Sequence, residues 1–276
     1  MALEICCQLE TTIPIEIEGL TPDWTHDKTL SEIERFEVFH GNRRMPLAEI
    51  FKVTGDPADQ TIRFTGLMQS VHWIGAHMKS GSIEVIGDTG RHVGSQMSNG
   101  RIEVHGSTGG WTGSEMKGGF IHVHGNAGHL TGSAYRGSSK GMKGGTILVD
   151  GNAGNEVGLS MRRGLIAIGG NAGDMTGFNM IAGSILIFGE CGIRPGAGMR
   201  RGTIALFGAN QPPLLPTFRH GAVLKSEMLR IILRTIETQG MKVDPTYADA
   251  LYESWHGDQV SSVGRGEILR RRVVAA

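Results

Sequence analysis

Short segments of alternating apolar and polar residues recur through the middle of the chain. Each lies between two glycines and places an apolar residue on either side of a single central residue, as in GRIEVHG at 100–106. Alternation with a period of two is typical of a strand with one buried face. The apolar pairs of the seven segments are Ile83/Val85, Ile102/Val104, Ile121/Val123, Ile147/Val149, Ile166/Ile168, Ile185/Ile187 and Ile204/Leu206.

The segments belong to a longer repeat. They start 19 residues apart, except that 26 residues separate the third from the fourth, and we place the extra residues at Tyr135–Gly141. A 19-residue unit is too small to bury its apolar face alone, so neighbouring units must stack with their strands in parallel. A methionine stands at the same position in every unit and is expected to fill the core: Met78, Met97, Met116, Met142, Met161, Met180 and Met199.

The glycines and the repeat length together predict the fold class. Regularly spaced glycines indicate corners, where the backbone needs a positive φ or a close approach to its neighbour. We therefore predict a mainly β protein, a right-handed parallel β-helix of about seven 19-residue coils. A left-handed helix of hexapeptides fits less well, because 19 is not a multiple of six.

The flanks do not follow the repeat, and they divide the chain into three parts. We predict a small α/β cap over 1–65, the β-helix over 66–210, and a helical extension with a tail over 211–276. The extension is predicted to hold an amphipathic helix around Lys225–Gln239 and a second helix around Pro245–Ser254. Such flanks can cover the open strand edges of a solenoid. We expect the first helix to cover the coils with one face and to contact a partner with the other.

Composition excludes several classes of protein. The chain has 276 residues with 43 glycines, and its 27 basic and 27 acidic residues cancel, which argues against a nucleic-acid-binding protein. The three cysteines lack a paired spacing, so we expect neither disulfides nor a cysteine-based metal site. We expect no signal peptide and no membrane span, and a cytoplasmic location.

Histidines raise the question of a metal site. His105 and His124 occupy the same position in adjacent units and should stack about 4.8 Å apart on the outer face, with His122 beside them. A metal site needs three or four converging ligands. The residues that follow in this position are Asp150, Gly169 and Phe188. A third ligand is thus doubtful, and we expect no bound metal.

No catalytic residue is predicted. Ser114, Ser133 and Ser160 recur near the corners without a consistent histidine or aspartate partner. The glycine-rich corners also lack the strand, GxGxxG and helix order of a dinucleotide-binding loop. A polysaccharide lyase would need an acidic face, which this repeat does not provide.

Basic residues follow the methionine in most units, and we call them the basic column. Over six steps of about 4.8 Å, equivalent positions should line up along roughly 29 Å, interrupted by Ser98 and Ile181. Stacked like charges repel one another, so the column suggests an anionic ligand or an acidic partner surface along it. The alternative is a solvated edge with counterions. The members of the basic column are Lys79, Lys117, Lys143, Arg162 and Arg200, with Arg163 and Arg201 beside them.

Together with its flanks, the repeat resembles the C subunits of formylmethanofuran dehydrogenase and of the bacterial formyltransferase/hydrolase complex. The resemblance rests on the seven coils, on GNRRMPLAEIF at 41–51, on LLPTF at 214–218 and on GRGEIL at 264–269. It implies a non-catalytic scaffold subunit of a complex that moves a formyl group between tetrahydromethanopterin and a methanofuran-type carrier and releases formate. The implied partners are an amidohydrolase-like subunit, a formyltransferase and a molybdopterin-type subunit or its degenerate relative, with no cofactor bound by this subunit itself.

Two alternatives stay open. The chain could be the C subunit of a molybdenum or tungsten formylmethanofuran dehydrogenase, although the GRGEIL ending favours the hydrolase complex. A relay domain like the C-terminal domain of glutamate synthase has a similar repeat, but it is normally fused behind large catalytic domains. The family's carriers bear a glutamate-rich tail, so the resemblance also implies a ligand for the basic column.

Overall fold

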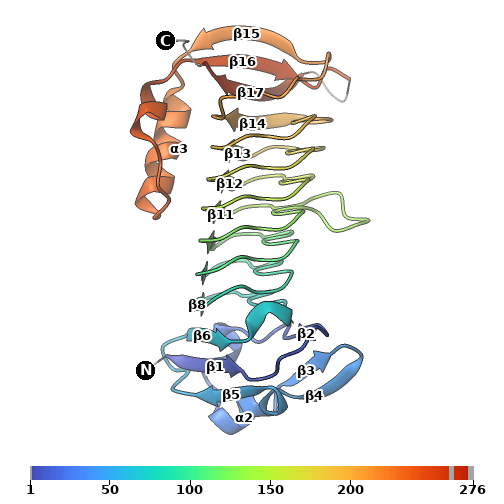
Figure 1. The fold of residues 1–276 in the computed structure, drawn as a ribbon, viewed down its shortest axis with the longest axis vertical. Helices are drawn as coiled ribbons and strands as arrows, with labels where there is room; N and C mark the ends of the chain where they lie inside the picture. The colour runs from blue at the N-terminus through green and yellow to red at the C-terminus, as the bar shows by residue number, and fades with distance from the viewer. Residues whose placement is uncertain (1, 261–263, 273–276) are drawn as a thin grey trace.

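The computed structural model describes residues 2–260 and 264–272. The protein is an elongated stack of strands with the N-terminal region at one end and the C-terminal region at the other (Figure 1). The seven alternating segments each form a strand. These strands are β8 (Ser82–Val85), β9 (Arg101–Val104), β10 (Phe120–Val123), β11 (Thr146–Val149), β12 (Leu165–Ile168), β13 (Ser184–Ile187) and β14 (Arg201–Leu206).

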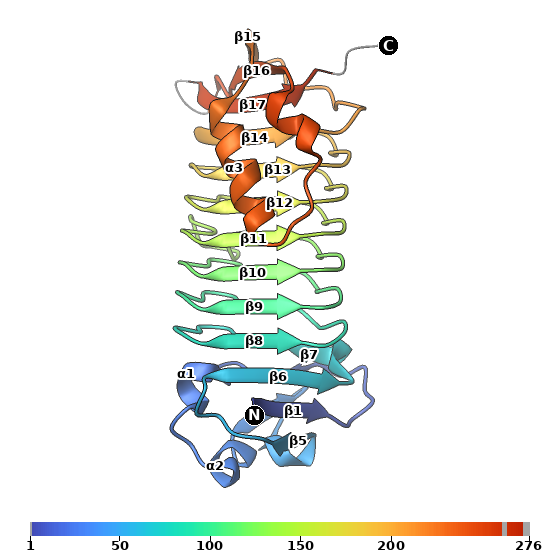
Figure 2. The ribbon, with the colours of Figure 1, turned by 90° about the vertical axis from the view of Figure 1, so that its left-hand side faces the viewer.

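The seven strands pair in parallel and in register, one above the other (Figure 2). Ile83 pairs with Ile102, Ile102 with Ile121, and so on to Ile204, so that each apolar pair faces the same interior. These inward side chains are at most 2% exposed. A second side of each coil carries single parallel bridges between small residues, which run from Thr89 to Cys191. The predicted stacking of mainly β repeats is confirmed.

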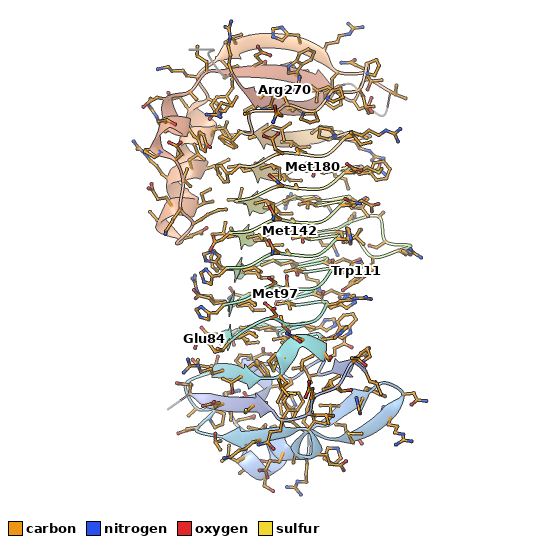
Figure 3. All side chains as sticks on the ribbon, in the orientation of Figure 1. Glu84, Met97, Trp111, Met142, Met180 and Arg270 are labelled. Carbon is orange, nitrogen blue, oxygen red and sulfur yellow. The ribbon has the colours of Figure 1, made fainter. Side chains whose placement is uncertain are left out.

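Methionines and glycines shape the corners as the repeat predicts. All seven repeat methionines are 0% exposed, and Figure 3 shows Met97, Met142 and Met180 along the middle of the stack. Gly119, which opens the GFIHVHG segment, has φ +92°, and an added Cβ would lie 2.7 Å from the Cε of Met97 in the coil below. Only glycine allows both the left-handed backbone and this methionine contact.

The N-terminal region extends the stack below β8. β6 (Thr61–Gly66) pairs in parallel with β8 and places Ile62 under Ile83, and β1 (Leu3–Cys7) pairs in parallel with β6. β5 (Phe51–Thr54) closes this end in the antiparallel direction. The stack thus begins before residue 66, because β6 repeats the alternating apolar pattern through Ile62 and Phe64.

The rest of the N-terminal region forms a separate sheet and short helices. In the described residues this sheet has four strands, β4 (Arg43–Pro46), β3 (Glu37–His40), β2 (Ile15–Glu16) and β7 (Val71–His72). The helices are α1 (Pro22–Thr25) and α2 (Leu30–Glu34), with 3-10 turns η1 (Leu47–Glu49) and η2 (Met68–Ser70). Thr29 and Glu32 form a reciprocal capping box at the start of α2.

The C-terminal region closes the other end with strands rather than with helices. β17 (Arg265–Arg271) pairs in parallel with β14, and β16 (Tyr252–Gly257) and β15 (Arg219–Leu224) follow in the antiparallel direction. The predicted helix around Pro245–Ser254 is wrong. This segment is a 3-10 turn, η3 (Pro245–Asp249), followed by β16, whose Tyr252 and Ser254 alternate inward with more exposed neighbours.

α3 (Glu227–Thr238) is the predicted amphipathic helix, but it lies along the outer face of the strands (Figure 2). Outward residues of β11 to β14 are apolar there, and they pack against the buried face of the helix formed by Leu229, Leu233 and Ile236. On the other face, Ile231 is 66% exposed. No helix in the described part of the chain has the length and apolarity that a membrane crossing requires.

Candidate functional site

The basic column exists as a continuous row of backbone positions. From Ser98 to Arg200, the residue that follows each repeat methionine donates its backbone N–H to the carbonyl of the methionine one coil earlier, at 2.6–2.9 Å. The side chains of Lys79, Lys117, Arg162 and Arg200 are exposed. The backbone hydrogen bonds therefore fix the spacing of the positions from which these charged side chains extend.

Charge is not uniform along the column. Lys143 is partly buried, and its Nζ lies 3.7 Å from a carboxylate oxygen of Glu115, whose side chain is 13% exposed. The backbone N–H of Lys79 donates to the carboxylate of Asp23 at 3.0 Å. Acidic side chains thus lie next to the column at Lys79 and at Lys143.

The arginines form the densest positive region of the column. Arg162, Arg163, Arg200 and Arg201 line a shallow hollow of about 410 Å³ on two coils that are separated by the coil of Ile181 and Ala182. Among the described residues, Arg162, Arg163 and Arg201 form no salt bridge. Guanidinium groups match carboxylates and phosphates with two parallel hydrogen bonds. This hollow, which we call the arginine hollow, can hold an anion.

A second polar cluster lies on the outer face of β8 to β11. His105 and His124 stack with ring centroids 5.1 Å apart, as the repeat predicts. The carboxylate of Asp150 lies 3.0 Å from His122 Nε2 and 2.8 Å from His124 Nδ1, and His124 Nε2 lies 3.0 Å from Glu103. His122 is 1% exposed, because the chain at the end of α3 covers it.

Opposing influences set the charges of this second cluster. Burial alone would raise the pKa of Asp150, but its hydrogen bonds with His122 and His124 outweigh burial and lower the pKa. Burial would lower the pKa of His124, but its contacts with Glu103 and Asp150 raise it. The cluster therefore favours the ionised form of the carboxylates on both sides of His124 and the protonated form of its imidazole.

An aromatic column occupies the opposite side of the stack, where Trp111 projects in Figure 3. The rings of Trp73 and His92 stack 4.0 Å apart, and His92 and Trp111 follow at 5.3 Å. All three residues have φ between +63° and +68°. Burial, with the nearby charges of His72 and Arg91, lowers the pKa of His92 to about 4.

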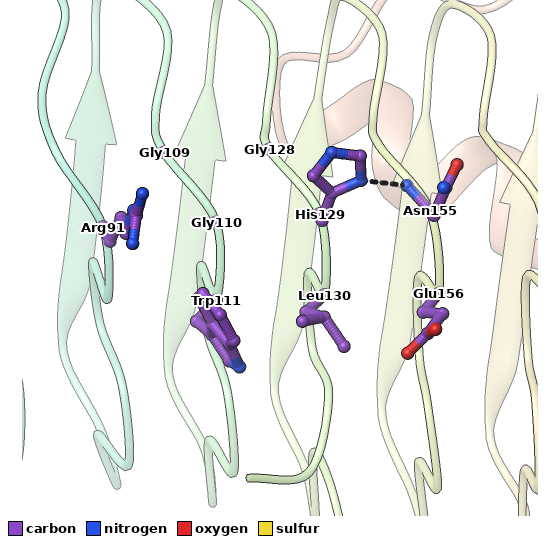
Figure 4. A pocket seen from close by; sticks show the side chains of 9 residues that line it. All are labelled: Arg91, Gly109, Gly110, Trp111, Gly128, His129, Leu130, Asn155 and Glu156. Atoms are coloured by element: carbon purple, nitrogen blue, oxygen red, sulfur yellow. Dashed lines mark hydrogen bonds between the residues drawn. The ribbon is translucent and has the colours of Figure 1, made fainter. Parts of the chain in front are cut away.

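The insertion at Tyr135–Gly141 lies against this aromatic column. The Tyr135 hydroxyl donates to Ser95 Oγ at 2.8 Å and lies 2.9 Å from His92 Nδ1. Beside it, Trp111, Leu130 and Glu156 line a pocket of about 660 Å³, in which the His129 ring accepts the backbone N–H of Asn155 (Figure 4). The insertion thus packs on the coils through a tyrosine.

The repeat predicts the basic column and the stacked histidines, but it does not reveal two other arrangements. The carboxylate of Glu103 is missed as a partner of His124, because it belongs to the neighbouring outward position of the strand. The aromatic column is missed as well. Its signal is present in the sequence, since Trp73, His92 and Trp111 follow one another at the 19-residue period.

No protein-family model matches the chain. Over 79 residues, it is 43% identical to the C subunit of the molybdenum-containing formylmethanofuran dehydrogenase 1 of Methanothermobacter thermautotrophicus. The C subunit of the tungsten-containing formylmethanofuran dehydrogenase 2 of that organism is 35% identical over 85 residues. These matches cover 28% and 29% of this chain and 20% and 32% of the two relatives. The chain therefore matches less than a third of the length of these curated relatives.

A solved structure matches almost the whole chain. A chain in the crystal structure of the formyltransferase/hydrolase complex from Methylorubrum extorquens, solved with methylofuran, superposes with a TM-score of 0.90. The match has 28% sequence identity and covers 98% of this chain and 100% of the other. The resemblance that the coils and flanks indicate in the sequence is confirmed by these comparisons.

Proposed function

We propose that this protein is a non-catalytic scaffold subunit of a formyltransferase/hydrolase complex. In this proposal the complex transfers a formyl group between tetrahydromethanopterin and a methanofuran-type carrier and releases formate. The observation that carries the proposal is the likeness to a chain of such a complex over 98% of the present chain. Its partners would be an amidohydrolase-like subunit, a formyltransferase and a degenerate relative of a molybdopterin subunit.

The finer features of the fold belong to the same proposal. We propose that the stack is a right-handed β-helix of seven repeat coils, with an N-terminal cap before it and an extension after it. Crossovers between parallel strands of one sheet are almost always right-handed, which supports this hand. We also place the protein in the cytoplasm, where its free thiols at Cys6, Cys7 and Cys191 would stay reduced.

We further propose that the basic column binds the anionic, glutamate-rich tail of the carrier, or else an acidic face of a partner. The arginine hollow supports this role, because four arginines are among the residues that line one shallow space. Each exposed contact contributes only about 0.2–1 kcal/mol, so several contacts in register hold a tail that can still move.

Purification of the native protein tests the scaffold role. We expect the chain to co-purify with the three proposed partners in constant proportion, and the isolated chain to have no hydrolase or transferase activity. A stable monomer with activity of its own would contradict the proposal.

Charge reversal tests the basic column in the assembled complex. Arg162→Glu, Arg163→Glu and Arg201→Glu together should raise the KM for the carrier roughly ten-fold at low salt, since several weak contacts are lost at once. The effect should shrink as salt is added.

A second set of reversals extends the test along the column. Reversal of Lys117, Lys143 and Arg162 should also raise the KM for the carrier at low salt. A control reversal at the exposed Arg35, Arg43 and Lys52 should leave KM unchanged. If the reversed complexes assemble and keep the unaltered KM at low salt, the column is only a solvated edge with counterions.

A molybdenum or tungsten formylmethanofuran dehydrogenase is the second candidate. The identities of 43% and 35% to C subunits of such enzymes, over 79 and 85 residues, support it as the second candidate. Metal analysis of the co-purified complex separates the two candidates. Stoichiometric molybdenum or tungsten would favour the dehydrogenase, and its absence from an active complex would favour the hydrolase.

A further inference from the structure

The second polar cluster combines two imidazoles with two carboxylates on three adjacent strands. His122 lies in β10 and His124 directly follows that strand, so their side chains leave the same face of the sheet. Glu103 comes from β9 on one side of β10, and Asp150 follows β11 on the other side. Parallel register brings these four residues together from three coils.

The spacing suits a metal ion. One donor atom from each of Glu103, His122 and His124 can be chosen so that all three lie within 4.8 Å of one another. Ligands about 2.0–2.2 Å from one zinc ion in tetrahedral geometry stand about 3.4 Å apart, so a small movement would bring these atoms to that spacing. His122 and His124 are separated by one residue of a continuous segment and can provide two such ligands.

Asp150 provides a carboxylate of the kind that commonly hydrogen-bonds a metal-binding histidine. Its two carboxylate oxygens contact one nitrogen of His122 and one nitrogen of His124, at 3.0 and 2.8 Å. A carboxylate in this role fixes the orientation and tautomer of an imidazole whose other nitrogen binds a metal. His124 meets this condition directly, because its second nitrogen faces Glu103 at 3.0 Å.

The surroundings are closed on one side and open on the other. His122 is buried under the chain that leaves α3, where a Cβ added to Gly240 would lie 3.7 Å from its ring. His124 and Asp150 border a hollow of about 510 Å³ that the same covering chain lines through Gly240, Met241 and Lys242. Away from this chain, the side chains of His124 and Glu103 remain about one third exposed, so water can reach them.

We propose that Glu103, His122 and His124 bind a divalent transition-metal ion of the Zn²⁺ class, with Asp150 orienting His124. Imidazole and carboxylate donors favour such ions over Ca²⁺ and Mg²⁺, which prefer oxygen ligands alone. Two carboxylates match the charge of the ion. This proposal replaces our expectation of no metal, which considered His105, His122 and His124 but sought a further ligand only in the position of His105 and His124, and so did not include Glu103.

Metal titration of the full chain tests the site. After dialysis against a chelator, Co²⁺ should bind at one ion per chain and give visible absorption, and Zn²⁺ should displace it. His124→Ala should weaken binding by about 100-fold or more, because it removes a ligand. Glu103→Gln keeps the size of the side chain and should also weaken binding strongly. Zn²⁺ should raise the melting temperature of the unaltered chain but not of these variants.

His105→Ala is the matched control. His105 lies in the same outward position one coil earlier, stacks on His124 and pairs with Glu84 at 2.9 Å, but it is not part of the proposed ligand set. It should bind one Co²⁺ with unchanged affinity. The proposal is overturned if the unaltered chain binds no stoichiometric Co²⁺, or if His105→Ala weakens binding as much as Glu103→Gln. Circular dichroism spectra should show that each variant is folded.

Discussion

The interior columns of the stack repeat the same kinds of residue in every coil, whereas the outer columns change from one coil to the next. Inside, an aliphatic pair and a methionine recur from β8 to β14, at most 2% exposed. Outside, one position runs from Glu84 and Glu103 through His122 to Leu148. The change coincides with α3, which covers the coils from β11 onward. The repeated interior thus specifies the fold, and the outer face adapts to what covers it.

Truncation of an interior methionine should have the largest effect on stability. Met142→Ala removes a side chain that is 0% exposed and leaves a cavity between coils, which costs about 2–5 kcal/mol of unfolding free energy. Urea unfolding followed by circular dichroism measures this loss. Met228→Ala, at a methionine 40% exposed on α3, should change stability by less than about 0.5 kcal/mol. Equal losses would contradict the division between interior and outer face.

Truncation under α3 tests whether the covered outer face behaves like interior. Ile236 is 0% exposed and packs on the coils, so Ile236→Ala should cost about 2–3 kcal/mol. It should also speed proteolysis within 221–250 more than elsewhere. Ile231→Ala, on the same helix but 66% exposed, is the matched control and should change neither quantity. If both variants behave alike, α3 is not held by its apolar face.

The aromatic column should make the free energy of unfolding depend on pH. The pKa of His92 is about 4 in the folded chain and 6.5 by default, so between these values the unfolded chain binds a proton that the folded chain excludes. Stability contributed by neutral His92 is therefore complete above pH 6.5 and is lost as pH falls toward 4. Unfolding curves from pH 7 to pH 4 should show a smaller loss for His92→Asn than for the unaltered chain. Parallel losses would show that His92 protonates freely.

Removal of charges from the basic column should have the smallest effect on stability. Arg162→Ala with Arg163→Ala should alter the unfolding free energy by less than about 0.5 kcal/mol, because both side chains are exposed. Thermal unfolding at low and high salt measures the change. A loss of several kcal/mol would mean that these arginines hold the coils together, and the column would then belong to the fold.

Much of the fold could be predicted because the interior pattern is local and repeated. Each Φ-x-Φ pair, where Φ is apolar, indicates its own strand, and the equal spacing aligns Ile102 with Ile121 without any knowledge of distant contacts. The strands β15 and β16 could not be predicted, because each occurs once and neither follows the 19-residue repeat. Their register depends on tertiary contacts such as the pairing of Tyr252 with Arg271.

The candidate sites show the same division. Residues that stack along one column, such as His105 and His124, could be placed from the repeat alone. Contacts that join different columns could not, because the side chains decide them. Lys143 reaches Glu115, and His124 reaches Glu103, across positions that the 19-residue period does not relate.

Both ends of the parallel stack stop at strands that run antiparallel, β5 at one end and β16 with β15 at the other. Between them, every coil adds the same rise of about 4.8 Å. Duplicating one 19-residue unit would therefore lengthen the molecule by one step and leave both ends as they are. Along the repeat, two surface groups in equivalent positions are therefore separated by a whole number of these steps.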